Sequence, residues 1–322
     1  MSNVLVIAET ISHGATPATL ELIAAAKVLA GDNGNVIAAV TASSGSDHPQ
    51  VPVDTLYVLD NDALGDSDSA TFDAATDAFT ALSINLKPDI ILFPRDDRSS
   101  VVAPRLAFRL NAAFARECTG AERTADGIVV TRPVYGGNAN ARFRIPFGAT
   151  CVITLRPGAF EPAANGTASD TRNFDVSESI RNSGSVLLRT VQEQQPGVRL
   201  EDAEIVVSGG RGLGGPEPFK LLGELAELLD GALGASRAAC DAGWIDHSHQ
   251  VGLTGKTVSP KLYLAFGISG ASQHMAGCSS ARNIVAVNTD PDASIFGDAR
   301  FGVAGDWSKV LPAFISTIRD IS

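Results

Sequence analysis

The stretch from residue 234 to residue 274, GASRAACDAGWIDHSHQVGLTGKTVSPKLYLAFGISGASQH, contains three strand-like apolar runs, each ending in small or polar residues. Arg237 follows the first run, a Gly-Leu-Thr-Gly turn at 252–255 follows the second, and His274 lies in a helix that opens after the third. Helix N-termini and closely approaching backbone amides bind phosphates, while cationic or hydrogen-bonding side chains tune a bound ring. The stretch therefore predicts an α/β site for a planar cofactor that carries phosphates.

The residues around this stretch predict a doubly wound parallel sheet over residues 204–322. Short apolar runs alternate there with helical patterns, which is typical of such α/β folds. The expected strands are 204–210, 261–269, 283–288 and one near 301–305. The expected helices are 216–230, a short one from Gly270 and a C-terminal one from Trp307.

Residues 1–192 predict a second and larger doubly wound α/β domain. Its expected parallel strands are the apolar runs 4–8, 36–40, 55–59 and 89–93. Three helices are expected in this domain. The first begins at Pro17, the second extends from Thr71 to about Ile84, and the third includes Arg105 and Leu110. From Ile128 onward, period-two alternation predicts added antiparallel strands at 128–135, 141–147 and 151–160. Polar composition predicts a linker at 193–203, and QEQQPG at 192–197 is its best candidate.

Composition narrows the class of protein. Among 322 residues, 25 Lys and Arg oppose 36 Asp and Glu, and the net charge of -11 repels nucleic-acid phosphates and anionic lipids. The four cysteines are scattered without a Cys-x-x-Cys pair, which predicts neither a metal site nor disulfides. The N-terminus lacks a basic signal segment, and no apolar run approaches the ~20 residues that span a bilayer. We therefore expect a cytoplasmic protein that is not membrane-inserted and does not bind nucleic acid.

The glycine-rich segment GRGLGG at 210–215 has the G-x-G-x-x-G spacing of dinucleotide-binding turns. That motif also needs an acid at the tip of the next strand, whereas Asp230 falls at the end of the intervening helix. Two interpretations stay open. The turn binds an anion with help from Arg211, or its glycines serve only the backbone geometry.

Two further candidates also have two interpretations. In GISGASQHMAG at 267–277, small residues open a helix with His274 in its first turn, which indicates a phosphate site or an ordinary connection with an exposed histidine. Arg237 is a cation over a cofactor ring or a partner in a surface salt bridge. The other four histidines lie in polar loop sequence without metal-ligand spacing, and no Ser/His/Asp catalytic arrangement emerges. We therefore expect no catalytic residues and no metal.

Several motifs together resemble the alpha subunit of electron transfer flavoproteins. In the second unit they are VVSGGRGL (206–213), FKLLGELAELL (219–229), GASRAACDAG (234–243), QVGLTGK (250–256), LYLAFGISGASQHMAG (262–277), AVNTDPDASIF (286–296) and GVAGDW (302–307). The first unit fits less closely, through VLVIAE (4–9), PATLELIAAA (17–26) and PRDDRSSVVAPRLAFRL (94–110). The resemblance implies a heterodimer in which the smaller C-terminal domain of the alpha subunit holds most of a non-covalent FAD, and the beta subunit completes its surroundings.

The resemblance also assigns residues to parts of the FAD. Arg211 would contact the cofactor from the glycine turn, and Ser236 and Arg237 would lie beside the isoalloxazine ring. The residues lining the flavin would be Gln250, Val251, Gly252, Leu253 and Thr254, with the Thr254 hydroxyl near N5. The pyrophosphate would be held by Ser269, Gly270, Ala271, Ser272 and Gln273. His274 would reach the pyrimidine edge, and the adenosine end would be held by Asn288, Asp306 and Trp307. Leu253 departs from the family pattern, in which Gln is frequent, so its contribution is expected from the backbone.

The residue types suit such a cofactor on chemical grounds. An added electron places negative charge along N1 and O2 of the flavin, so a nearby cation stabilises the reduced form more than the oxidised form. Arg237 and His274 fit that role. A contribution of roughly 1 to 3 kcal/mol shifts a one-electron potential by about 40 to 130 mV.

The expected function is that of an electron carrier without substrate turnover of its own. It would pass electrons from acyl-CoA or related flavin-containing dehydrogenases to a quinone oxidoreductase. Within the family, the alternative is the alpha subunit of an electron-bifurcating, NADH-linked complex. Outside it, a self-sufficient nicotinamide or flavin dehydrogenase and a nucleotide-sensing regulatory module stay open.

Overall fold

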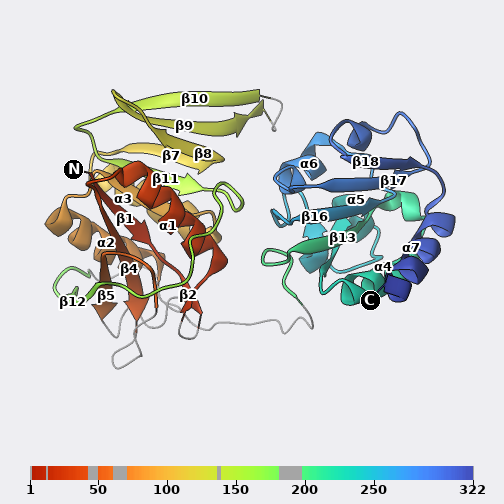
Figure 1. Ribbon diagram of the computed structural model, residues 1–322, viewed down its shortest axis with the longest axis horizontal. Helices are drawn as coiled ribbons and strands as arrows, with labels where there is room; N and C mark the ends of the chain where they lie inside the picture. The colour runs from red at the N-terminus through yellow and green to blue at the C-terminus, as the bar shows by residue number, and fades with distance from the viewer. Residues whose placement is uncertain are drawn as a thin grey trace. The chain divides into compact units, whose positions relative to one another are not determined.

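The structure is a computed structural model that describes residues 2–11, 14–42, 50–60, 71–135, 139–180 and 198–321. The chain divides into two compact units, Met1–Val134 with Ala139–Gln192 and Tyr135–Asn138 with Glu193–Ser322 (Figure 1). Residues 193–197 of the predicted linker lie outside the described residues. Leu200 and Ala203 are buried in a core of the second unit. The end of the predicted linker is therefore packed as part of this unit.

A seven-stranded parallel sheet forms the centre of the first unit, with the order β12-β5-β4-β1-β6-β11-β7. The strands are β1 (Asn3–Ile7), β4 (Asn35–Ala42), β5 (Thr55–Asp60), β6 (Ile90–Pro94), β7 (Ala113–Cys118), β11 (Cys151–Leu155) and β12 (Asp170–Asp175). The chain fills one side of β1 with β4 and β5, and then crosses to the other side with β6. This change of direction is the defining feature of a doubly wound sheet.

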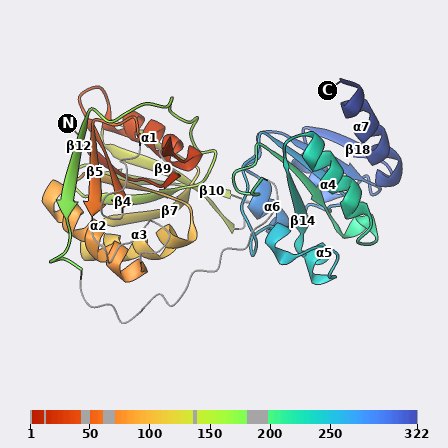
Figure 2. The same ribbon diagram turned by 90° about the horizontal axis from the view of Figure 1, so that it is seen from below.

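Helices cover both faces of this sheet (Figure 2). They are α1 (Pro17–Ala30), α2 (Phe72–Leu86) and α3 (Asp97–Arg109). Val4 and Val6 point to the core under α1, whereas Leu5 and Ile7 point to the core under α2 and α3. Because both faces of β1 are buried, the strand is continuously apolar rather than alternating.

Threonine and aspartate side chains mark where these helices begin. The Thr16 hydroxyl accepts a hydrogen bond from the Thr19 amide at 3.1 Å, immediately before Pro17. Thr71 caps α2 in the same way, and an Asp96 carboxylate oxygen accepts from the Ser99 amide at 2.6 Å at the start of α3. Each cap satisfies an amide that the helix itself leaves unpaired.

An antiparallel three-stranded sheet packs on the same face as α1, in the order β10-β9-β8. Its strands are β8 (Gly120–Arg123), β9 (Gly127–Val134) and β10 (Ala139–Pro146), and a short β2 (Thr10–Ile11) pairs with β3 (Gly14–Ala15) elsewhere in the unit. The prediction of added antiparallel strands is confirmed for β9 and β10. It is wrong for Cys151–Leu155, which is a buried parallel strand between β6 and β7, because both of its faces are covered.

The second unit contains a six-stranded parallel sheet with the order β15-β14-β13-β16-β17-β18. The strands are β13 (Ile205–Gly209), β14 (Ala232–Ser236), β15 (Gln250–Val251), β16 (Leu262–Phe266), β17 (Ile284–Asn288) and β18 (Phe301–Ala304). The chain again builds outward on both sides of its first strand. The predicted α/β class with two doubly wound sheets is therefore confirmed.

The helices of the second unit also lie on both faces of its sheet. One face packs against α4 (Pro218–Leu228), α5 (Arg237–Asp241) and α7 (Trp307–Ile321), and the other against α6 (Ser272–Cys278). Short 3-10 turns are η2 (Arg211–Leu213), η3 (His247–His249) and η4 (Ser294–Gly297). None of the described helices combines the length and apolar character needed to cross a bilayer.

We expect Glu21 on α1 to make the first unit less stable as pH rises. Loss of solvation raises the pKa of this half-buried carboxyl from 4.5 to about 7. A hydrogen bond from the Gly158 amide acts in the opposite direction and lowers the pKa, but its effect is smaller. The buried charge lowers the free energy of unfolding. This loss of stability is absent below pH 4.5, where the carboxyl is protonated, and is complete above about pH 7, where it is ionised. Glu21→Gln should raise the free energy of unfolding by about 1 kcal/mol at pH 8, after discounting for partial exposure.

Urea unfolding of the wild type and the Glu21→Gln variant at pH 5 and pH 8 measures this difference. Glu178→Gln, at an exposed position in the same unit, is the control. An equal effect of Glu21→Gln at both pH values would contradict the assignment.

Candidate functional site

The predicted cofactor residues all lie at or just beyond the carboxyl ends of strands in the second sheet. Because the six strands are parallel, the segments that follow them meet at one edge. In chain order these segments begin at Arg211, Ser236, Gln250, Ser269, Asn288 and Asp306. Open α/β sheets bind their ligands at this edge.

Direct contacts join the central segments of this edge. Ser236 at the end of β14 is the register partner of Val251 in β15. The Leu253 amide donates a hydrogen bond to the Gln273 carbonyl at 2.7 Å. A Cβ atom on Gly252 would lie 3.0 Å from the same carbonyl oxygen, so glycine allows the turn to approach α6 closely. The structure thus brings together three groups of residues that are far apart in the sequence.

Gln250 holds the Thr254 side chain in a defined orientation. The buried Gln250 amide donates from Nε2 to Thr254 Oγ1 at 3.0 Å, and its Oε1 lies 3.1 Å from His247 Nδ1. Since Thr254 Oγ1 accepts this hydrogen bond, its own proton is directed away from Gln250. The exposed Thr254 hydroxyl is therefore a donor available to a ligand.

His274 is buried and neutral. The residue is 8% exposed, and its Nε2 lies 2.9 Å from the hydroxyl of the fully buried Tyr263. Burial lowers the His274 pKa from 6.5 to about 4, while the Val251 backbone opposes this shift. The exposed histidine considered from the sequence is therefore wrong, and in the described part of this chain the lowered pKa disfavours the cationic form at neutral pH.

Arg237 is exposed and already has an ionic partner. Its guanidinium side chain is 65% exposed, and Nε lies 3.3 Å from an Asp241 carboxylate oxygen one turn along α5. In this chain by itself, the residue forms the surface salt bridge that the sequence left open. The pair is screened by solvent, so the guanidinium group can also turn toward a ligand at small cost.

The glycine-rich turn uses its amides within the protein. The Gly210 amide donates to the Phe266 carbonyl at 2.8 Å, and the Gly212 amide donates to the Gly267 carbonyl at 2.9 Å. The Leu213 and Gly214 amides donate to carbonyls inside the turn. These amides are not free for an anion, so the structure supports the backbone-geometry interpretation. The Arg211 side chain is exposed.

Gly270 lets the segment after β16 pack against η4. Its φ is +84°, and a Cβ atom there would lie 2.3 Å from the Ile295 nitrogen. The Ile295 amide in turn donates to the Ser269 carbonyl at 3.0 Å. The neighbouring residues Ser269, Ala271, Ser272 and Gln273 are exposed. Gly270 is thus needed for the shape of the segment, and its neighbours present the surface.

The three residues assigned to the adenosine end have structural roles within this chain. Asn288 donates from Nδ2 to the Ile268 carbonyl at 2.9 Å and accepts from the Asp290 amide at 3.0 Å. An Asp306 carboxylate oxygen accepts from the Ser308 amide at 2.9 Å, and this hydrogen bond lowers the Asp306 pKa. Trp307 is half-buried and packs against the core beneath α4 and α7.

Two buried polar atoms test whether these residues fit a cofactor. Ser236 Oγ and His274 Nδ1 have no hydrogen-bond partner in the described part of the chain. Leaving such an atom unpaired costs about 1–3 kcal/mol, so its position calls for a ligand or water. Together with the Thr254 hydroxyl, these polar atoms suit the nitrogen and carbonyl groups of a flavin ring.

Several contributors to this site were missed from the sequence. Tyr263 lies in a strand whose apolar sequence gives no sign that its hydroxyl meets His274, and Gly267 is separated in sequence from the turn that it contacts. His247 lies in polar loop sequence and its side chain is 64% exposed, but it also contacts Gln250. These contacts depend on tertiary packing, and no local sequence signal marks them.

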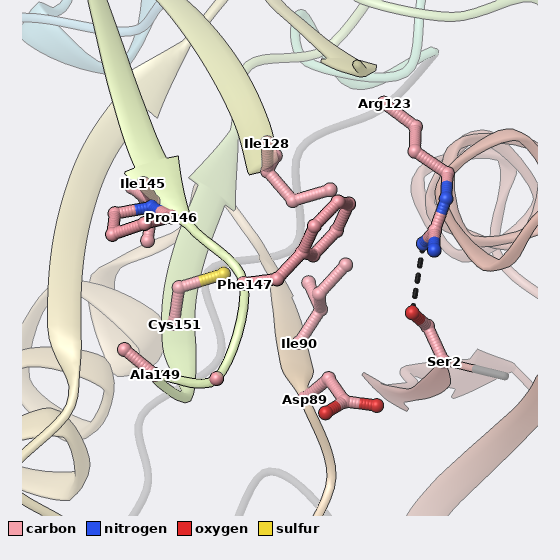
Figure 3. Close-up of a pocket in the computed structure, with 11 residues that line it drawn as sticks. Ser2, Asp89, Ile90, Arg123, Ile128, Ile145, Pro146, Phe147, Ala149 and Cys151 are labelled. Atoms are coloured by element: carbon pink, nitrogen blue, oxygen red, sulfur yellow. Dashed lines mark hydrogen bonds between the residues drawn. The ribbon is translucent and has the colours of Figure 1, made fainter. Parts of the chain in front are cut away.

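A cavity of about 230 Å³ lies in the first unit, whereas the predicted cofactor residues belong to the second (Figure 3). Ser2, Ile90 and Cys151 line it at the amino ends of β1, β6 and β11. Arg123 also lines it, and donates to Ser2 Oγ at 2.7 Å and to the Leu29 carbonyl at 2.9 Å. The cavity is at the edge opposite to the one where α/β sheets bind ligands, and its cation already has partners.

Comparison with known proteins relates both units to one family. The electron transfer flavoprotein domain matches residues 4–179, and the electron transfer flavoprotein FAD-binding domain matches residues 199–279. The electron transfer flavoprotein subunit alpha of Thermoanaerobacterium thermosaccharolyticum is 39% identical over 310 residues, which cover 94% of this chain and 93% of that protein. The subunit alpha of Mycobacterium leprae is 35% identical over 331 residues, or 99% of each chain.

A third relative, the subunit alpha of Megasphaera elsdenii, is 40% identical over 243 residues, covering 72% of this chain and 71% of that protein. The matches extend over both sheets and include most of the segments at the carboxyl edge. The chain belongs to the electron transfer flavoprotein alpha subunit family: its role is in electron transfer, its cofactor is FAD, and its partner is a beta subunit.

Proposed function

We propose that this chain forms a heterodimer with its beta subunit in the cytoplasm and carries electrons between other redox proteins. The proposed donors are flavin-containing dehydrogenases, in particular acyl-CoA dehydrogenases of fatty acid β-oxidation, and the proposed acceptor is a quinone oxidoreductase. The chain turns over no substrate of its own in this scheme. The observation that carries the proposal is the set of unpaired or exposed polar groups of Ser236, Thr254 and His274 at one edge of the second sheet.

FAD supplies reversible one- and two-electron chemistry when bound, and the residues of this chain hold and tune it. In the proposed site, Ser236, Arg237 and His274 lie beside the ring, and Thr254 donates to it. The turn residues Gln250, Val251, Gly252 and Leu253 shape the wall of the site. The phosphate segment is Ser269, Gly270, Ala271, Ser272 and Gln273, while Arg211, Asn288, Asp306 and Trp307 hold the rest of the cofactor.

The division of the chain supports this assignment of roles. We propose residues 1–192 as the N-terminal domain, 193–203 as a linker whose last residues pack on the second unit, and 204–322 as the FAD-binding domain. The proposed ring and phosphate residues all belong to the second of the two compact units. The first unit is then available for contact with the beta subunit.

Replacing Arg237 by Ala should lower the potential of bound FAD. The guanidinium charge attracts the ring more strongly once the ring gains an electron, so its removal disfavours reduction. Since Arg237 is exposed and paired with Asp241, we expect a shift of about 40 mV, at the low end of the range for such a cation. Lys should restore part of this shift, because it returns the charge without the planar guanidinium group.

Spectroelectrochemical titration of the FAD-loaded heterodimer measures this potential. Arg319→Ala is the matched control, because Arg319 is a similarly exposed, ion-paired arginine on α7 of the same unit. Equal potentials for the wild type and Arg237→Ala would refute the electrostatic role of Arg237.

FAD occupancy should depend on the beta subunit. The proposed ring donors lie at an open edge, and the exposed Thr254 and Leu253 leave that side of the site in contact with water. We expect the chain purified alone to retain less than a tenth of the FAD that the heterodimer retains. Size-exclusion chromatography with absorbance detection of flavin measures both; a fully loaded monomer would contradict the expectation.

The carrier role is tested by direct electron transfer. The FAD-loaded heterodimer is mixed with a reduced acyl-CoA dehydrogenase in a stopped-flow instrument, and reduction of its flavin is followed by absorbance. Rapid reduction, followed by reoxidation on adding a quinone oxidoreductase, is the expected result. NADH is tested separately as a donor. Failure with a panel of dehydrogenases, together with rapid reduction by NADH, would replace the simple carrier with the bifurcating, NADH-linked alternative.

A further inference from the structure

Polar contacts connect two of the proposed flavin residues, Arg237 and Thr254, through His247. Arg237 Nε lies 3.3 Å from one carboxylate oxygen of Asp241, and the other oxygen lies 3.9 Å from His247 Nε2. His247 Nδ1 lies 3.1 Å from Gln250 Oε1, and Gln250 Nε2 lies 3.0 Å from Thr254 Oγ1. His247 therefore lies between a residue proposed beside the ring and a residue proposed to donate to it.

The main chain of Gln250 is fixed, so only its side-chain amide is left to be oriented. Gln250 pairs with Ala235 of β14, and its carbonyl accepts a hydrogen bond from the Lys256 amide at 2.7 Å. The residue is 5% exposed, so its amide has little access to water. A side-chain amide has an acceptor oxygen at one end and an NH2 donor at the other. The group that meets one end therefore decides which atom faces Thr254.

His247 supplies the group that meets the oxygen. Because Oε1 of the Gln250 amide is only an acceptor, this contact requires a proton on His247 Nδ1. The amide then presents Nε2 to Thr254 Oγ1, and the Thr254 proton is left for a ligand. Without a donor at position 247, the amide can turn over and present Oε1 to Thr254. The hydroxyl would then donate to Gln250 instead of to a ligand.

The turn η3, which carries His247, is held by contacts that do not involve the imidazole. An Asp246 carboxylate oxygen accepts from the Ser248 amide at 2.8 Å, and the Gln250 amide donates to the His247 carbonyl. The side chain of His247 is 64% exposed, so its removal opens no cavity in the core. Truncation of His247 is therefore expected to remove the contact with the Gln250 side chain and to leave the turn in place.

We propose that His247 is a positioning residue, which donates from Nδ1 to Gln250 Oε1 and thereby orients the amide so that the Thr254 hydroxyl donates to the FAD ring. The inference rests on the proposed function, because that function places Thr254 against the cofactor. The 3.9 Å separation between His247 Nε2 and Asp241 is too long for a hydrogen bond. The contact on that side has a smaller, electrostatic role.

His247→Ala should lower the one-electron potential of bound FAD. Reduction adds negative charge to the ring, and a hydrogen bond donated to the ring becomes stronger as that charge grows. We expect the equilibrium constant for reduction to fall about fivefold when Thr254 is no longer held as a donor, which is about 40 mV at 59 mV per tenfold change. His247→Asn should restore most of this loss, because Asn Nδ2 is as many bonds from the main chain as His Nδ1.

Spectroelectrochemical titration of the FAD-loaded heterodimer measures these potentials. His249→Asn is the matched control, because His249 lies in the same turn but its Nδ1 lies 2.8 Å from the Leu233 carbonyl. We expect the control to have the potential of the wild type. Equal potentials for the wild type and His247→Ala overturn the proposal, as does a potential in His247→Asn as low as that in His247→Ala.

A double-mutant cycle tests whether His247 acts through Thr254. Thr254→Val replaces the hydroxyl by a methyl group of similar size and should itself lower the potential. In that background His247→Ala should produce no further change, because the hydroxyl that it orients is absent. A further fall as large as that in the wild-type background would show that His247 acts by another route, and the proposal would be overturned.

The Thr254→Val variant also separates this proposal from the assignment on which it rests. If Thr254→Val leaves the potential unchanged, the placement of Thr254 at the ring fails, and the role of His247 fails with it. If Thr254→Val lowers the potential and His247→Ala does not, only the role of His247 fails. These titrations need no dehydrogenase, so they give their result even if stopped-flow transfer from every donor fails.

Discussion

The close approach of two loops in the second unit fixes the edge on which the cofactor residues lie. Gly267 has a φ of +63°, and a Cβ atom there would lie 2.8 Å from the Gly212 carbonyl carbon. The Gly212 amide donates to the Gly267 carbonyl at 2.9 Å, so the segments after β13 and β16 hold each other through their backbones. Only glycine permits this distance at this φ. Because both partners belong to the chain, the contact requires no atom of the cofactor.

A rigid edge allows the donors on it to be oriented in advance. Gln250 engages the Thr254 oxygen, and Tyr263 engages one nitrogen of His274. In each case a neighbour uses part of the hydrogen-bonding capacity and leaves a defined remainder for a ligand. Groups ordered during folding need not be ordered again on binding, and this reduces the entropy cost of association.

The sequence predicted much of the fold, because apolar runs and helix starts are local features. The direction of Cys151–Leu155 was not predictable, since parallel or antiparallel pairing depends on strands far away in the chain. The polar strand Asp170–Asp175 was missed, because it is an edge strand that depends on β5 for its hydrogen bonds. The positions of the site residues could be predicted, because these residues follow the ends of strands that are recognisable in the sequence. The burial of His274 could not be predicted from the sequence, because it depends on packing against Tyr263.

Arg237 and His274 would influence the charge on a bound flavin in different ways. Arg237 is exposed and ion-paired, so its attraction acts through water and weakens as salt shortens the Debye length, about 8 Å at physiological ionic strength. His274 is buried and neutral, so its contribution is a short-range hydrogen bond that salt screens little. The potential of FAD in the proposed site then has one part that falls with ionic strength and one that does not. At high salt the part that persists belongs to the buried polar groups.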